Sequence, residues 1–260
     1  MRSLPDGNRP SPAGTALLAK AFLLLRQISR RHHAGWTLTE LARACDLHHA
    51  TALRILRALQ AEDMVVRRPG TKHYVLGPAT LELGASVHPG FDLRAAVAQP
   101  LRRLARMTGG NAFFNVRSGY DSVVIGRELG GHKTHALPLE VGARRPLCAT
   151  AGGTALMLLM SAREQIAALR YGLQQVAPIG RQRRAAITRL VQRSRRRGFG
   201  INEDLIVPGM TGIGVAAGPG NAPLGAFSIT ILSSRVRGRG VEEITGLLRA
   251  EAAALGEPAA

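Results

Sequence analysis

The sequence predicts an α+β protein with two domains: an N-terminal winged helix-turn-helix joined by a linker helix to an α/β domain with a mainly antiparallel sheet. Three observations predict this fold. The chain has 260 residues, more than the roughly 100–150 that are typical of one domain. Its first part shows helical periodicity followed by two short strands, and its second half alternates strands with helices. The expected boundaries are a flexible tail over 1–13, the winged helix-turn-helix over 14–78, linker helices over 79–100 and the second domain over 101–260.

Three helices are expected in the first domain. Apolar residues recur at three- and four-residue spacing over 17–28, which predicts the first helix. The Thr-Leu-Thr-Glu sequence at 37–40 is a capping box, in which the threonine hydroxyl accepts from the glutamate amide while the carboxylate accepts from the cap amide. A short second helix should therefore run to about Cys45, and a third begins near His49.

A β-ribbon is expected after the third helix. Residues 64–68 and 72–76 have the composition of strands, and Pro69-Gly70-Thr71 between them is typical of a tight turn. Three helices followed by such a ribbon predict a winged helix-turn-helix.

The third helix has one apolar face and one polar face. In a helix-turn-helix, one helix enters the major groove of DNA, where its side chains reach base edges while flanking groups hold phosphates. We expect His49, Thr51 and Arg54 to face bases, and the basic residues of the helix end and wing to contact phosphates. The candidate DNA-binding residues are Thr39, His48, His49, Ala50, Thr51, Arg54, Arg57, Arg67, Arg68 and Lys72. The alternative is a three-helix bundle with a solvated basic face.

The second half begins after a short helix near 80–85 and a longer one from Asp92 to about Met107, which Pro100 is expected to kink or split. The predicted strands are 112–117, 122–129, 134–141, 213–217 and 224–232, with a turn at 218–221. The predicted helices are 152–160, one opened by the Ser161–Glu164 capping box, an Arg-rich one over 182–196, and one from Val241.

The charge balance suggests a polyanionic partner. The chain has 35 Lys and Arg against 17 Asp and Glu, a net charge of +18, and such a balance is usual for proteins that bind nucleic acid. All but three of the basic residues are Arg, however, so part of the excess is open to a compositional explanation. Residues 1–90 hold 12 basic and 6 acidic side chains, and most of the excess lies in the second half.

Composition excludes several other classes. The longest apolar runs are far shorter than the roughly 20 residues that span a bilayer, and no secretory signal is recognised, so a cytoplasmic protein without membrane contact is expected. Cys45 and Cys148 are 103 positions apart and form no CxxC pattern, which argues against a disulfide scaffold or a metal knuckle. We expect no cofactor and no metal site.

Motifs in both halves resemble those of the IclR family of bacterial transcriptional regulators. In the first half these are Leu-Thr-Glu-Leu-Ala-Arg at 38–43, the segment 50–59 and Tyr-Val-Leu-Gly at 74–77. Residues 142–153 resemble the family's G-x-R-x-P-L-H-A-T-A-x-G-K loop, and residues 197–209 resemble its R-G-Y-A-x-D-D-E-E…P-G segment. The resemblance runs from about residue 16 to 255 in the expected order.

The resemblance implies a ligand-responsive regulator, either a repressor or a dual regulator of a catabolic operon. It implies a homodimer, which can pair into a tetramer, on a palindromic operator in double-stranded DNA. It also implies that the C-terminal domain carries effector binding and oligomerisation, with a small organic acid, aromatic or not, as the effector. The positions that match the family's effector pocket are Cys148, Ala151, Gly152, Gly153, Asn202, Met210, Gly212, Ser228 and Thr230.

Two physical arguments support that pocket. The amides of 151–153 open a helix, where unpaired N–H groups and the helix dipole favour an anion. Ser228 and Thr230 alternate with apolar residues, so both hydroxyls should lie on one face of a strand. The alternative interpretation is structural: residues 151–153 form an ordinary turn, and the two hydroxyls form hydrogen bonds with backbone groups.

The chain departs from the family pattern at three places. Thr154 stands where the family has Lys, Asn202 where it has the first Asp, and Thr211-Gly212 where it has Arg-Cys or Arg-Ser. Asn in place of Asp removes a negative charge and adds a donor, which favours an anionic or neutral polar ligand. Glycine at 212 removes bulk, which favours a ligand larger than a two- or three-carbon acid.

Other functions have weaker support. An enzyme would need a nucleophile and a base, and Cys148 with His132 or His135 is the one arrangement worth naming, although nothing in the sequence implies their contact. No phosphate-binding, nucleotide-binding or hydrolase motif is recognised, so no catalytic residues are expected. A metal- or amine-responsive winged-helix regulator is the nearer alternative because eight His are available. A constitutive architectural DNA-binding protein would not need the second domain.

Overall fold

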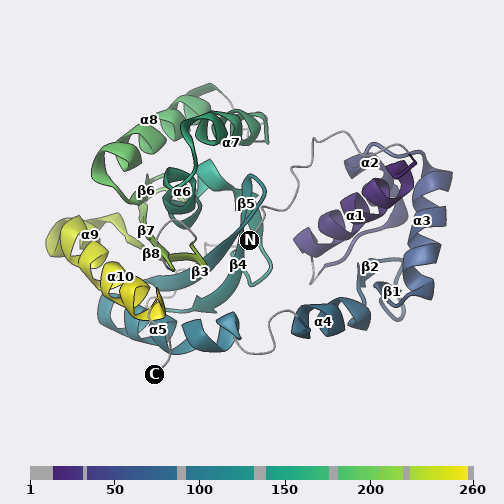
Figure 1. Ribbon diagram of the computed structural model, residues 1–260, viewed down its shortest axis with the longest axis horizontal. Helices are drawn as coiled ribbons and strands as arrows, with labels where there is room; N and C mark the ends of the chain where they lie inside the picture. The colour runs from purple at the N-terminus through teal and green to yellow at the C-terminus, as the bar shows by residue number, and fades with distance from the viewer. Residues whose placement is uncertain are drawn as a thin grey trace. The chain divides into compact units, whose positions relative to one another are not determined.

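The computed structural model describes residues 14–31, 34–86, 92–131, 139–175, 181–205, 207–218 and 223–256 (Figure 1). These residues form two compact units, which divide between Asp92 and Leu93. Each unit is described by itself. Within the described ranges, no helix is long and apolar enough to cross a membrane.

The N-terminal unit is a winged helix-turn-helix, as predicted. Its elements are α1 (Ala16–Ile28), η1 (Ser29–Arg31), α2 (Leu38–Ala44), α3 (His49–Ala61), β1 (Val65–Arg67), β2 (Tyr74–Leu76) and α4 (Pro78–Ala85). Strands β1 and β2 pair antiparallel, with Val65 opposite Leu76. Leu24, Leu41, Leu56 and Trp36 form the buried core that holds the helices to the ribbon.

Local signals explain where these elements begin and end. The Thr37 hydroxyl accepts from the Glu40 amide, and the Glu40 carboxylate accepts from the Thr37 amide at 2.8 Å, so the predicted capping box is present. The Thr37 amide and the Thr37 hydroxyl both donate to the Glu40 carboxylate, which lowers the pKa of that carboxyl. Asp46, between α2 and α3, has φ of 50°, the left-handed conformation that Asp tolerates in turns.

The C-terminal unit is an antiparallel sheet with helices on both faces. Its helices are α5 (Leu93–Thr108), η2 (Leu147–Ala149), α6 (Ala151–Leu158), α7 (Ala162–Gln175), α8 (Arg181–Arg197), α9 (Ser233–Arg239) and α10 (Val241–Gly256). Its strands are β3 (Asn111–Ser118), β4 (Asp121–Glu128), β5 (Arg144–Pro146), β6 (Gly200–Glu203), β7 (Met210–Ala217) and β8 (Gly225–Leu232), in the spatial order β5-β4-β3-β8-β7-β6. Every neighbouring pair of strands runs antiparallel.

The two faces of the sheet carry different side chains because successive residues of a strand point to opposite sides. One face packs on α5 and α10 (Figure 1), and Phe114 and Phe227 meet there edge to face with ring centroids 4.7 Å apart. The other face is covered by α6, behind which α7 and α8 pack in a second apolar cluster. The second face also receives Ser228 and Thr230, and it holds the candidate site.

Some elements differ from the prediction. Helix α5 continues as one helix through the buried Pro100. Val97 of α5 is buried in the core of the C-terminal unit, so α5 belongs to that unit from Leu93 on, whereas the prediction placed residues up to 100 in a linker. Of the strand expected over 134–141, residues 134–138 lie outside the described residues and 139–141 are not a strand. Most of the expected 218–221 turn also lies outside them. Strands β5 and β6 and helix α9 have no counterpart in the prediction.

Candidate functional site

Helix α3 presents a polar face to solvent. Ala52, Ile55 and Leu56 are buried on its inner side, whereas Arg54 and Arg57 are exposed on its outer side. Within the described residues neither arginine has an acidic partner. The remaining candidates on or beside the helix are Thr39, His48, His49 and Ala50, which are exposed, and Thr51, which is half-buried. This face is therefore available to contact DNA phosphates and base edges.

The wing places further cations at its tip. The Thr71 amide and hydroxyl both donate to the Arg68 carbonyl at 3.1 Å, and Gly70 takes the left-handed conformation with φ of 71°, so the turn is tight. Lys72 is exposed beside it. Arg67 is exposed with its guanidinium 5.8 Å from the Tyr74 ring, and Arg68 is half-buried. Among the wing cations, Lys72 has the most freedom to reach DNA.

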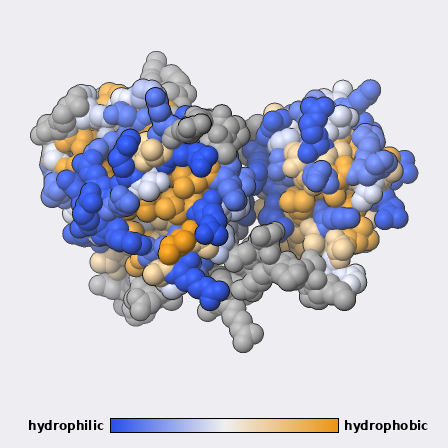
Figure 2. Space-filling model, turned by 90° about the horizontal axis from the view of Figure 1, so that it is seen from above, coloured by the Kyte–Doolittle hydropathy of each residue, from blue (hydrophilic) through white to orange (hydrophobic). Residues whose placement is uncertain are grey.

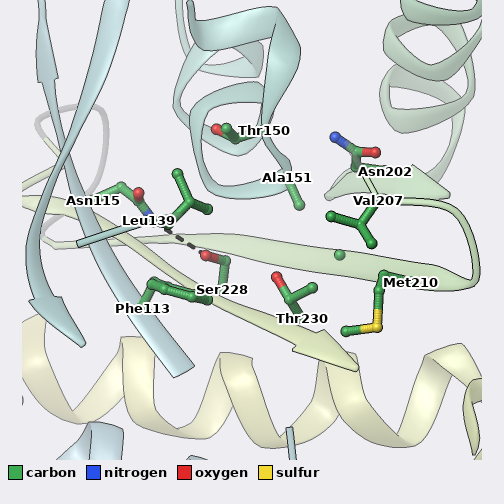
Figure 3. Close-up of a pocket in the computed structure, with 11 residues that line it drawn as sticks. Phe113, Asn115, Leu139, Thr150, Ala151, Asn202, Val207, Met210, Ser228 and Thr230 are labelled. Carbon is green, nitrogen blue, oxygen red and sulfur yellow. Dashed lines mark hydrogen bonds between the residues drawn. The ribbon is translucent and has the colours of Figure 1, made fainter. Parts of the chain in front are cut away.

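A pocket lies in the C-terminal unit between the inner face of the sheet and the start of α6 (Figure 3). Its walls bound about 440 Å³ of space that includes open solvent, and about 30 Å³ of that space can hold the centre of a water molecule. Its lining is Phe113 and Asn115 from β3, Ser228 and Thr230 from β8, Met210 and Gly212 from β7, Asn202 from β6, Thr150 and Ala151 at the start of α6, and Leu139 and Val207 from loops.

Polar side chains in the pocket are held by specific hydrogen bonds. The Asn115 amide donates to the Ser228 hydroxyl at 3.1 Å, and the Asn202 amide donates to the Ala149 carbonyl at 2.8 Å. Thr150 is the N-cap of α6 and accepts from the Gly153 amide at 3.0 Å. The register shifts between Phe114 and Asn115, where Ile125 of β4 has no partner on β3, so the bulge lies in β4 directly opposite the pocket residue Asn115. The hydrogen bond to Ser228 holds the Asn115 amide at the pocket wall.

Backbone approaches backbone where α6 meets the sheet. A Cβ on Gly200 would lie 1.9 Å from the Ala151 carbonyl oxygen, and one on Gly214 would lie 2.6 Å from the Ala151 carbonyl carbon. A Cβ on Gly152 would lie 2.5 Å from the Asn115 amide nitrogen. These glycines let the first turn of α6 rest directly on β6, β7 and β8, which sets the position of the pocket's upper wall.

The electrostatics of the pocket come from dipoles. None of the described lining residues carries a charge. The Gly153 amide is bonded to the Thr150 hydroxyl and the Thr154 amide to the Thr150 carbonyl. Of the first four amides of α6, those of Ala151 and Gly152 therefore have no hydrogen-bond partner among the described residues, and Ala151 lines the pocket. A carboxylate or a carbonyl oxygen would be stabilised there by the N-terminal end of the helix dipole.

Comparisons with known proteins match both units. Residues 17–69 match the IclR helix-turn-helix domain, and residues 85–256 match the C-terminal domain of bacterial IclR transcriptional regulators. The chain belongs to the IclR family. Members of this family are transcriptional regulators rather than enzymes, and this chain is a ligand-responsive, DNA-binding regulator of that kind.

Relatives cover nearly the whole fold of this IclR-family chain. The HTH-type transcriptional repressor AllR of Escherichia coli (strain K12) is 25% identical over 204 residues, which are 78% of this chain and 74% of AllR. The crystal structure of the regulator from Alicyclobacillus acidocaldarius is 26% identical and covers 92% of this chain and 96% of its own, with a TM-score of 0.71. An IclR homologue from Microbacterium hydrocarbonoxydans, crystallised with 4-hydroxybenzoate, is 20% identical over 91% of this chain and 96% of its own, with a TM-score of 0.68.

Six of the nine positions expected from the IclR pattern line the pocket: Ala151, Asn202, Met210, Gly212, Ser228 and Thr230. The other three lie beside it. Gly152 packs against the sheet, and the Gly153 amide donates to the Thr150 hydroxyl of the helix cap. Fewer amides are therefore available to a ligand than the three expected. Cys148 points away from the pocket, since a Cβ on Gly172 of α7 would lie 2.3 Å from the Cys148 sulfur.

Five lining residues were missed by sequence reasoning: Phe113, Asn115, Leu139, Thr150 and Val207. A local signal was available for Thr150, because threonine is a preferred N-cap residue whose hydroxyl accepts from the amide three residues later. Of the departures from the IclR pattern, Thr154 and Thr211 are buried outside the lining, and Gly212 lies in it. A Cβ on Gly212 would lie 3.2 Å from that of Ala151, so part of the space gained by glycine is already filled.

Two of the alternatives depend on metal-binding residues and on an activated cysteine. They contain no group of three or more His, Cys, Asp or Glu that could hold a metal ion. His132 and His135, the expected bases for Cys148, lie outside the described residues. Burial raises the pKa of the Cys148 thiol to about 12, and the Asp121 carboxylate acts in the same direction.

Both thiols of the native IclR-family chain are expected to resist alkylation by iodoacetamide at pH 8. With a pKa of about 12, about one Cys148 thiol in ten thousand is ionised at that pH, and the thiolate is the nucleophile. Burial also raises the pKa of Cys45. Mass spectrometry should find both cysteines modified in guanidinium chloride and neither in buffer. Rapid labelling of Cys148 in the native chain would show that it is an accessible, activated nucleophile.

Proposed function

We propose that the chain is a repressor, or a dual regulator, of a catabolic operon, and that a small organic acid controls it by binding the pocket at the start of α6. The observation that carries the proposal is that six residues expected independently from the family pattern line one pocket. A relative named as a repressor covers 78% of the chain, which supports the repressor reading.

The chemistry of the pocket supports a monocarboxylic acid over a cation. Its lining has no carboxylate among the described residues, so a cationic amine would be buried without a partner, which costs several kcal/mol. An acid would instead meet the Ala151 amide at the start of α6, with the Ser228 and Thr230 hydroxyls as further donors.

The apolar part of the lining supports a ring or a branched chain on that acid. Phe113, Leu139, Val207 and Met210 line the pocket and belong to one apolar cluster. The homologue crystallised with 4-hydroxybenzoate binds an acid that combines a ring with two polar ends. We infer an aromatic or similarly sized acid for this chain as well.

The DNA-binding half of the proposal rests on the exposed cations of α3 and the wing. A single helix-turn-helix reads a short half-site, so two copies are needed for a long operator. We therefore propose a homodimer, or a pair of dimers, on a palindromic operator, because two-fold protein symmetry is mirrored in the half-sites.

A thermal-shift screen tests the effector. We expect 4-hydroxybenzoate or a related aromatic acid to raise the melting temperature of the full-length protein, because a ligand that binds only the folded state stabilises it by mass action. Benzylamine and adenine serve as the amine and purine counterparts. The Ser228→Ala and Thr230→Val variants should show a smaller shift, since each loses a hydroxyl in the pocket with little change in volume.

The matched control is Ser234→Ala, which removes an exposed hydroxyl outside the pocket and should leave the shift unchanged. Stabilisation by the amine or the purine together with no response to any acid would overturn the effector proposal. Acid binding that is unaffected by both pocket variants would place the ligand elsewhere.

A further inference from the structure

A groove between α7 and α8 lies on the outer side of these helices, away from the sheet and the effector pocket. It holds about 830 Å³ of atom-free space, much of it open to solvent. Its lining is Ile166, Leu169, Arg170, Leu173 and Gln174 from α7, and Arg184 from α8. Figure 2 shows hydrophobic residues surrounded by hydrophilic ones on the C-terminal unit, on the side where α7 and α8 lie.

Helix α7 packs on the core through the buried Ala168 and Gly172. Ile166, Leu169 and Leu173 follow the i, i+3, i+7 spacing of a stripe along the groove. Leu169 and Leu173 are half-buried and also pack against the apolar cluster beneath α7 and α8, whereas Ile166 is 61% exposed. Such a stripe on a soluble protein marks a contact surface more often than a scattered exposed residue does.

The groove is rimmed by positive charge. Helix α8 has eight arginines and no acidic residue in 17 positions. Arg170 and Arg184 are exposed at the groove itself, and neither has an ion-pair partner among the described residues. An occupant must therefore offer both apolar side chains and carboxylates.

We propose that this groove binds an acidic, amphipathic helical segment of another protein. The apolar side chains of such a helix would lie on the stripe of α7 and its carboxylates against Arg170 and Arg184, as in other helix-in-groove interfaces. A second copy of this chain fits poorly, because a two-fold contact through this face would set arginine against arginine. DNA fits poorly too, because a phosphate backbone leaves the apolar floor unfilled.

The test is a binding titration with the full-length protein and one designed peptide. The fluorescein-labelled peptide is a helix of about five turns, with leucine at i, i+3 and i+7 and glutamate on both flanks; its scramble has the same composition. We expect the protein to bind the peptide at least about tenfold more tightly than the scramble. Arg170→Glu combined with Arg184→Glu should weaken binding about tenfold or more, and Ile166→Ser should weaken it as well.

The controls match charge and hydropathy. Arg106→Glu combined with Arg249→Glu makes the same change in net charge at exposed sites of α5 and α10, and Leu129→Ser removes an exposed aliphatic side chain outside the groove. Both should bind like the wild type. Circular dichroism melting confirms that every variant is folded.

Three results would overturn the proposal. Equal affinity for peptide and scramble would mean that only charge attracts the probe. Loss of nonspecific duplex DNA binding in the Arg170/Arg184 variant, with peptide binding unchanged, would assign the surface to nucleic acid. A change of oligomeric state in Ile166→Ser, measured by sedimentation, would assign it to a second copy of the chain.

Discussion

Gly200→Ala is expected to unfold the C-terminal unit or to destabilise it by more than about 3 kcal/mol. The added Cβ would lie 1.9 Å from the Ala151 carbonyl oxygen. That oxygen belongs to the backbone of α6, so no side-chain rotation relieves the clash, and the helix must move off the sheet. Because β6 is an edge strand held by β7, the strand itself could detach instead.

The measurement exploits the single tryptophan of the chain. Trp36 is buried in the core of the N-terminal unit, so its fluorescence reports that unit, whereas circular dichroism reports both. In urea, Gly200→Ala should lower the circular dichroism midpoint and leave the Trp36 transition nearly unchanged.

Gly246→Ala is the matched control, because a Cβ at this exposed position of α10 meets nothing within 4 Å. It should stabilise the unit by about 0.5–1 kcal/mol, since alanine favours a helix interior over glycine. A Gly200→Ala protein as stable as the wild type would refute the close approach of α6 to β6.

Arg54→Ala is expected to reduce the ratio of operator affinity to random-DNA affinity about 10-fold or more. A bidentate contact from arginine to a base is worth about 1–3 kcal/mol, so affinity for the operator should fall about 10-fold or more while nonspecific affinity changes little. Lys72→Ala should instead weaken binding to the operator and to random DNA alike, because a wing lysine contacts phosphate. It should also reduce the slope of log affinity against log salt concentration by about one.

Fluorescence anisotropy with a site selected from a random library, and with a scrambled duplex, measures both effects over a range of salt concentrations. Lys20→Ala, which removes an exposed lysine of α1, is the control and should change neither affinity nor slope. Equal losses on the two DNAs for Arg54→Ala would refute a base-reading role.

Elements with local signals were predictable from the sequence. Both capping boxes set helix starts through residues three apart, and both are present in the structure. The Arg-rich helix α8 was predicted by composition and spacing, within one residue at each end. Strands β5 and β6 are three and four residues long and exist because of their partners β4 and β7, so no local pattern reveals them.

The pocket was predictable only in part, because its wall depends on pairing between distant strands. Phe113 lies opposite Ser228 through the β3–β8 register, and a sequence does not give that register. Cys148 belongs to the expected loop but lies in the short helix η2, whose turn directs its sulfur toward α7. Proximity along the chain was therefore a poor guide to which side chains share the cavity.

The glycine contacts beneath α6 also indicate how this regulator could be redesigned. Gly200 and Gly214 meet α6 through main-chain atoms, so a side chain at either position is expected to disturb the docking of α6. The side walls are built from the side chains of Phe113, Val207 and Met210 rather than from main-chain contacts. A biosensor for a new acid should be sought by varying these walls while the glycines are held constant.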